Sequence, residues 1–202
     1  MIKFFTNREA SNRLDINLSK WKRWSRDFLP PDPLGGMQSG FARQYSPDGA
    51  FTVFFGGHLV ADLKFTIPEA KQIIKDLHPW FTGKGFYFDA GSNATVNQGV
   101  DQRVKKYIIF IEREKDPDNT ISFMYTIRGI ISNEPVNYKG FEIMEERYTE
   151  TIMGLQTKKM SAVDVNIVKM VNVTDVLNNF VLRLNLNRSR YPALSLTNSN
   201  RS

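Results

Sequence analysis

The sequence predicts an α+β protein, in which an all-α N-terminal half precedes a β-rich antiparallel half with a terminal helix. Up to about residue 81, apolar residues recur at helical spacing between capping signals. After "TGKG" at 82–85 the segments become rich in β-branched and aromatic residues, which are typical of strands. We therefore expect two domains, 1–85 and 86–190, followed by a basic flexible tail at 191–202.

The composition is that of a globular chain without disulfides. Hydrophobic residues make up 41% and charged residues 24%, so the chain has enough apolar side chains for a core. Because there are no cysteines, disulfides, thiolate zinc sites and cysteine nucleophiles are excluded. The chain shows neither a signal-peptide core nor an apolar run of about 18 residues. We expect a cytoplasmic protein with no membrane partner.

Positive charge gathers at the two ends of the chain. The net charge is +6, and residues 1–45 carry eight basic groups against four acidic ones. The central part is nearly balanced, and the end of the chain holds Arg183, Arg188, Arg190 and Arg201 with no acidic residue. This distribution favours an anionic partner such as nucleic acid.

Two short helices are predicted at the start of the chain. Thr6 and Glu9 form a capping box, which predicts a helix over about 7–14. The sequence "DIN" at 15–17 breaks the apolar pattern, and Asn17 is a suitable cap for a second helix. The two helices are thus expected to be joined by a three-residue turn.

The second helix has an aromatic side and a basic side. At 100° per residue, Trp21, Trp24 and Phe28 share one side. The opposite side carries Ser19, Lys22, Arg23 and Arg26, whereas Lys20 lies beside Trp24. Pro30 and Pro31 end the helix. The tryptophans therefore belong to the core, and the basic residues face outward.

Further elements follow in the same half. The stretch "PPDPLGGMQSGFARQYS" indicates a loop with strand character near "FARQY", as in a short hairpin or wing. Ser46 caps a buried helix that Gly56 and Gly57 weaken or kink. Thr66 and Glu69 form a second capping box that begins another helix, which is expected to end before Pro79.

The C-terminal half is predicted to be an antiparallel meander. Three segments, 106–114, 120–131 and 140–154, have strand composition, and "KDPDN" separates the first two. "DVNIVKMVNV" is a further candidate strand, and Thr174 is the expected cap of a final helix.

The N-terminal half resembles a known family of DNA-binding domains. "TNREASNRLDINLSKWKRWSRDFLPP", "SGFARQYSPDGA" and the two helices that follow resemble the MerR-like winged helix-turn-helix domain over residues 4–81. The resemblance implies that the second helix is a recognition helix and that the wing contacts phosphate. With the basic side of the helix, the predicted DNA-binding residues are Ser19, Lys20, Lys22, Arg23, Arg26, Arg43 and Tyr45.

These patterns predict a sequence-specific, double-stranded DNA-binding protein, a transcriptional regulator rather than an enzyme. No Ser/His/Asp arrangement, P-loop or dinucleotide fingerprint is present. His58 and His78 lack metal-ligand spacing, so no metal or cofactor is expected. The β-rich half is assigned to homo-oligomerisation as a dimer, with effector sensing or recruitment of another protein as alternatives. Other readings are an architectural or excision factor of a mobile element or phage, and a protein-interaction module that does not bind DNA.

Overall fold

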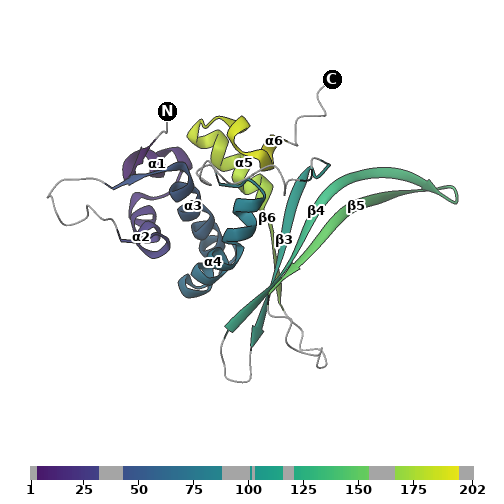
Figure 1. The fold of residues 1–202 in the computed structure, drawn as a ribbon, viewed down its shortest axis with the longest axis horizontal. Helices are drawn as coiled ribbons and strands as arrows, with labels where there is room; N and C mark the ends of the chain where they lie inside the picture. The colour runs from purple at the N-terminus through teal and green to yellow at the C-terminus, as the bar shows by residue number, and fades with distance from the viewer. Residues whose placement is uncertain are drawn as a thin grey trace.

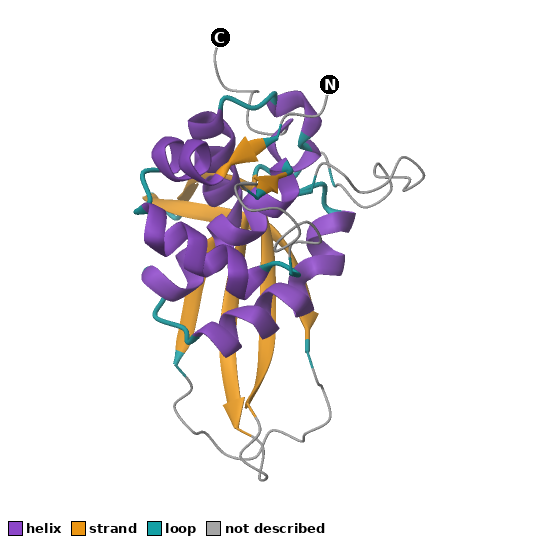
Figure 2. Ribbon diagram, turned by 90° about the vertical axis from the view of Figure 1, so that its left-hand side faces the viewer, coloured by secondary structure: helices purple, strands orange, loops and turns teal. Residues whose placement is uncertain are grey.

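Helices cover one face of a four-stranded antiparallel sheet, and a long hairpin projects beyond the sheet (Figures 1 and 2). This is a computed structural model, which describes residues 4–31, 43–87, 101, 103–115, 121–154 and 167–195. The predicted α+β class is confirmed. In the part of the chain that is described, no helix is both long enough and apolar enough to cross a membrane.

The first two helices match the prediction. Helix α1 (Asn7–Leu14) is capped by Thr6, and helix α2 (Leu18–Phe28) by Asn17, whose side chain accepts hydrogen bonds from the backbone of residues 19 and 20. Asp15 ends α1 in the left-handed region with φ of 58°, which turns the chain sharply. Local capping chemistry therefore fixes the angle at which α2 leaves α1.

Helix α3 (Pro47–Ala61) runs through the glycine pair that was expected to weaken it. A Cβ added at Gly56 would lie 2.6 Å from the Phe28 ring, and one at Gly57 would lie 2.4 Å from the Trp24 ring. The two glycines therefore let the aromatic side of α2 approach the α3 backbone, and packing offsets their poor helix propensity.

Helix α4 (Ile67–Gly83) starts at the predicted capping box of Thr66 and Glu69. The prediction that it ends before Pro79 is wrong, since Pro79 lies inside the helix. The extra turn carries Phe81, which is fully buried and packs against Phe51 and Phe55. We infer that this burial compensates for the backbone hydrogen bond that proline cannot donate.

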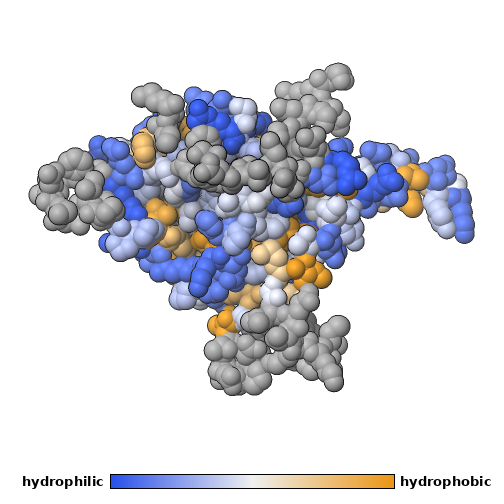
Figure 3. Space-filling model, in the orientation of Figure 1, coloured by the Kyte–Doolittle hydropathy of each residue, from blue (hydrophilic) through white to orange (hydrophobic). Residues whose placement is uncertain are grey.

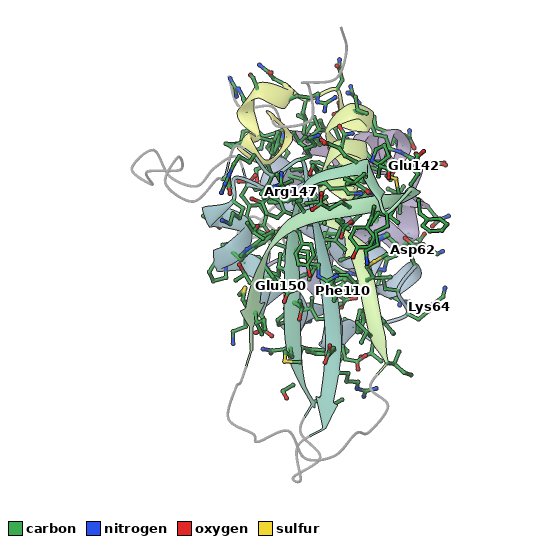
Figure 4. The ribbon with its side chains drawn as sticks, turned by 90° about the vertical axis from the view of Figure 1, so that its right-hand side faces the viewer. Asp62, Lys64, Phe110, Glu142, Arg147 and Glu150 are labelled. Carbon is green, nitrogen blue, oxygen red and sulfur yellow. The ribbon has the colours of Figure 1, made fainter. Side chains whose placement is uncertain are left out.

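The sheet has the order β5-β4-β3-β6, with antiparallel pairing throughout. Its strands are β3 (Lys106–Lys115), β4 (Ile121–Tyr138), β5 (Phe141–Met153) and β6 (Val168–Asn172). The predicted meander is confirmed. Alternate residues of β3 and β4, among them Ile109 and Tyr125, are buried beneath the helices. The opposite face lies toward the viewer in Figure 4 and carries Phe110 and Glu150.

Strand β4 is longer than expected and forms an arm with β5. The segment 132–138, which was predicted to be outside a strand, pairs with β5 as far as Tyr138. Lys139 and Gly140 have φ of 50° and 87°, which makes a two-residue turn of the primed class. Pro135 is tolerated because a two-stranded ribbon leaves one side of each strand without a ladder partner. We call residues 132–147 the arm.

One hydrophobic core spans both predicted domains. Phe51 of α3 packs against Phe81, Tyr87 and Phe180, and the last belongs to helix α5 (Val173–Leu184). The boundary at residue 85 therefore does not separate two cores. Helix α5 is capped by Asn172 rather than Thr174, whose buried hydroxyl accepts a hydrogen bond from the Tyr107 backbone instead.

The predicted flexible tail begins too early. After the short helix η1 (Arg188–Arg190), the side chains of Tyr191, Ala193 and Leu194 are buried, and the last two lie in α6 (Pro192–Ser195). The expectation is thus wrong for 191–195, because these apolar residues join the core. Residues 196–202 lie outside the described part of the chain.

Two arginines join the first helix to the last long one. Arg13 Nη1 donates to the Leu184 carbonyl at 3.1 Å, and Arg183 Nη1 donates to the Leu14 carbonyl at 2.7 Å. Each guanidinium satisfies a carbonyl that the end of the other helix leaves free. The C-terminal part of the chain is therefore fastened directly to α1.

Candidate nucleic-acid interface

The basic side of α2 lies on the molecular surface. Five of the predicted DNA-binding residues are exposed along this helix: Ser19, Lys20, Lys22, Arg23 and Arg26. In the described ranges, none of the two lysines and two arginines among them forms an ion pair with an acidic side chain. Lys20, which the helical wheel put at the edge of the core, is exposed as well. We call this surface the α2 basic face.

The opposite side of α2 anchors the helix. Trp21 is fully buried and Trp24 is 7% exposed, so both are core residues as expected. The Trp21 ring packs edge-on against Tyr45 at 5.4 Å between centroids. Burying two indoles orients α2 firmly and leaves the basic residues pointing away from the body.

Tyr45 does not lie where the sequence placed it. It belongs to β2 (Gln44–Tyr45), which pairs with β1 (Phe5–Thr6), and it is only 2% exposed. Its hydroxyl donates to Asn7 Oδ1 at 2.6 Å and lies 3.0 Å from Ser25 Oγ. The predicted contact with phosphate is therefore a misassignment, because the phenol is committed to holding α1, α2 and β2 together.

Arg43 lies at the edge of the same region. Its Nη2 donates to the Pro30 carbonyl at 2.7 Å, and its guanidinium carbon lies 5.7 Å from the centre of the Tyr45 ring. A guanidinium has five N–H donors, so this contact leaves donors for a further acceptor. Residues 32–42 of the predicted wing lie outside the described residues.

Sequence reasoning missed the polar contacts beneath this surface. Asn7 and Pro30 hold Tyr45 and Arg43, respectively, from distant positions in the chain. No local pattern marks an asparagine that will meet a tyrosine 38 residues later. Ser25 is buried on the same side of α2 as the tryptophans, where its hydroxyl donates to the Lys22 carbonyl.

Titratable groups elsewhere serve the fold. Tyr125 Oη donates to Asp76 Oδ2 at 2.7 Å beneath the sheet, and burial and this carboxylate raise the pKa of the phenol. Burial and the nearby Asp48 carboxylate also raise the pKa of Tyr87 to about 12, although the Thr52 hydrogen bond lowers it. Over the ranges that are described, no three His, Asp or Glu side chains come together as a metal site would require.

Comparison with known proteins gives no match to a family model, a curated protein or a solved structure.

Proposed function

We propose that the chain binds double-stranded DNA through the α2 basic face and acts in the cytoplasm as a sequence-specific transcriptional regulator. The observation that carries this proposal is the division of α2 into a buried aromatic side and an exposed side with four cations. A helix held rigidly by its apolar side is suited to enter the major groove, which is about 12 Å wide.

The surroundings of α2 support the same proposal. Helices α1 and α2, joined by residues 15–17, have the order and turn length of a helix-turn-helix, in which the second helix reads the groove. Strand β2 and helices α3 and α4 come after α2, in the order of the MerR-like winged domain that the sequence resembles. Within this proposal Arg23 and Arg26 contact base edges or phosphates, and Arg43 contacts the sugar-phosphate backbone of the DNA.

Replacing Lys22, Arg23 and Arg26 together by alanine tests the proposal. We expect the affinity for a random-sequence duplex at low salt to fall by about tenfold or more, because three phosphate-neutralising cations are lost. The readout is fluorescence anisotropy of a labelled duplex. Since all three side chains are exposed, the thermal midpoint of unfolding should hardly change.

A matched control removes the same charge elsewhere. Lys71, Lys75 and Lys105 are also exposed, and they lie on α4 and just before β3. Their triple alanine variant should retain most of the affinity. Equal losses in the two variants would show a diffuse charge effect instead of an interface, and no binding by the unaltered chain would favour a protein-interaction module.

A further inference from the structure

The arm exposes apolar side chains that it cannot bury by itself. Among its residues Val136, Tyr138, Phe141 and Ile143 are exposed by 38%, 57%, 74% and 46%. A two-stranded hairpin without a covering surface is marginally stable in water. Figure 3 shows the arm reaching away from the body, with hydrophobic patches between hydrophilic ones.

The strand register sorts these side chains onto one face. Cross-strand partners share a face, and every second residue along a strand returns to it. One face of the arm therefore carries four cross-strand pairs, which run from the tip to the root: Tyr138–Phe141, Val136–Ile143, Glu134–Glu145 and Ser132–Arg147. The other face carries more polar pairs, including Asn137–Glu142 and Asn133–Glu146. We call the first of these faces the apolar arm face.

The apolar arm face carries two glutamates beside its apolar rows, and Arg147 lies one row closer to the root. Glu134 and Glu145 lie directly opposite each other, and like charges in that position destabilise a hairpin. Within the described residues neither glutamate has an ion-pair partner. At the tip the Lys139 ammonium lies 5.2 Å from the centre of the Tyr138 ring, and it too has no carboxylate partner there. A cation and two anions thus flank the apolar rows on opposite sides.

We propose that two copies of this chain associate by packing their apolar arm faces together in antiparallel orientation. With a two-fold axis at the Val136–Ile143 row, the glutamate row of each copy lies opposite the tip of the other. Lys139 of each copy then meets Glu134 and Glu145 of its partner, and the Tyr138 hydroxyl can donate to the same carboxylates. The arrangement covers the apolar rows and gives Glu134, Glu145 and Lys139 ion-pair partners that they lack among the described residues of one chain.

Charge reversal tests this pairing by sedimentation velocity on the full-length chain. The unaltered chain should be dimeric. The variant Glu134→Lys/Glu145→Lys and the variant Lys139→Glu should each dimerise at least about tenfold more weakly, because both of their symmetric contacts become repulsive. An equimolar mixture of the two variants should restore a dimer, since a heterodimer regains both contacts.

The control is Glu142→Lys/Glu146→Lys, which makes the same charge change on the opposite face of the arm. This variant should dimerise as the unaltered chain does. A chain that stays monomeric at every concentration would overturn the proposal and favour a different partner for the arm. A dimer that the reversals leave unchanged, or a mixture that does not recover, would overturn it as well.

Discussion

At the scale of single residues, Glu69 links the start of a helix to the sheet. Its carboxylate accepts hydrogen bonds from the Thr66 backbone and hydroxyl, each at 2.8 Å, and lies 3.2 Å from Arg113 Nε on β3. Burial tends to raise the pKa of Glu69, but the Thr66 hydrogen bonds and the charges of Arg113 and Lys169 outweigh burial and lower it. The ionised carboxylate is therefore the form that the fold stabilises.

We predict that Glu69→Gln lowers the free energy of unfolding by about 1 kcal/mol at pH 7, because the charge-assisted contacts are lost. A pKa that is lowered in the folded state stabilises the protein above the ordinary value of 4.5, and this contribution disappears as pH falls through the folded pKa. The difference in free energy of unfolding between the unaltered chain and Glu69→Gln should therefore become smaller in acid.

Urea unfolding at neutral and acidic pH measures this difference. Glu112→Gln is the control, because Glu112 has no ion pair within the described part of the chain and should show little effect at either pH. A difference for Glu69→Gln that is the same at both pH values would contradict the assigned role.

Residue-level predictions from sequence succeeded where the chemistry is local. The caps Thr6, Asn17 and Thr66 act within three residues, so their spacing identifies them. Tyr45 was misassigned because its partners Asn7 and Ser25 come from distant parts of the chain. A local pattern cannot distinguish a wing tyrosine that contacts a ligand from one that is buried.

At the scale of elements, the contact between α2 and α3 determines how the α2 basic face is presented. The Trp24 and Phe28 rings occupy the space that side chains at positions 57 and 56 would fill. The sequence predicted both helices, but it also predicted that the glycine pair would weaken or kink α3. The pair instead allows α2 to pack closely, which depends on a neighbouring helix that no local pattern shows. Two expected element ends were wrong because tertiary contacts override local signals: α4 continues past Pro79, and β4 continues past residue 131 and through Pro135.

We predict that Gly57→Ala destabilises the protein by about 1–2 kcal/mol. The added methyl group would lie 2.4 Å from the Trp24 ring, and this overpacking exceeds the gain of up to about 1 kcal/mol in helix propensity. Gly83→Ala is the control, because no atom lies within 4 Å of the added methyl group. Urea unfolding should show a loss for the first variant and none for the second; a stabilised Gly57→Ala would contradict the close packing.

At the scale of the whole molecule, the chain is one body with two exposed features. Arg13 and Arg183 fasten α1 to α5, and a shared core runs beneath the helices. The α2 basic face lies on the helical part, and the arm projects from the sheet (Figure 1). Sequence patterns could not show the shared core, because it depends on contacts between residues more than 100 positions apart.

The salt dependence of duplex binding tests the proposed DNA interface most directly. Anisotropy titrations across a salt series give the slope of log affinity against log salt concentration, about 0.9 for each phosphate neutralised. The unaltered chain should show a slope of several phosphates, and the Lys22, Arg23 and Arg26 triple alanine variant a slope smaller by about 2–3. An unchanged slope in that variant, or no binding at low salt, would contradict DNA recognition through α2.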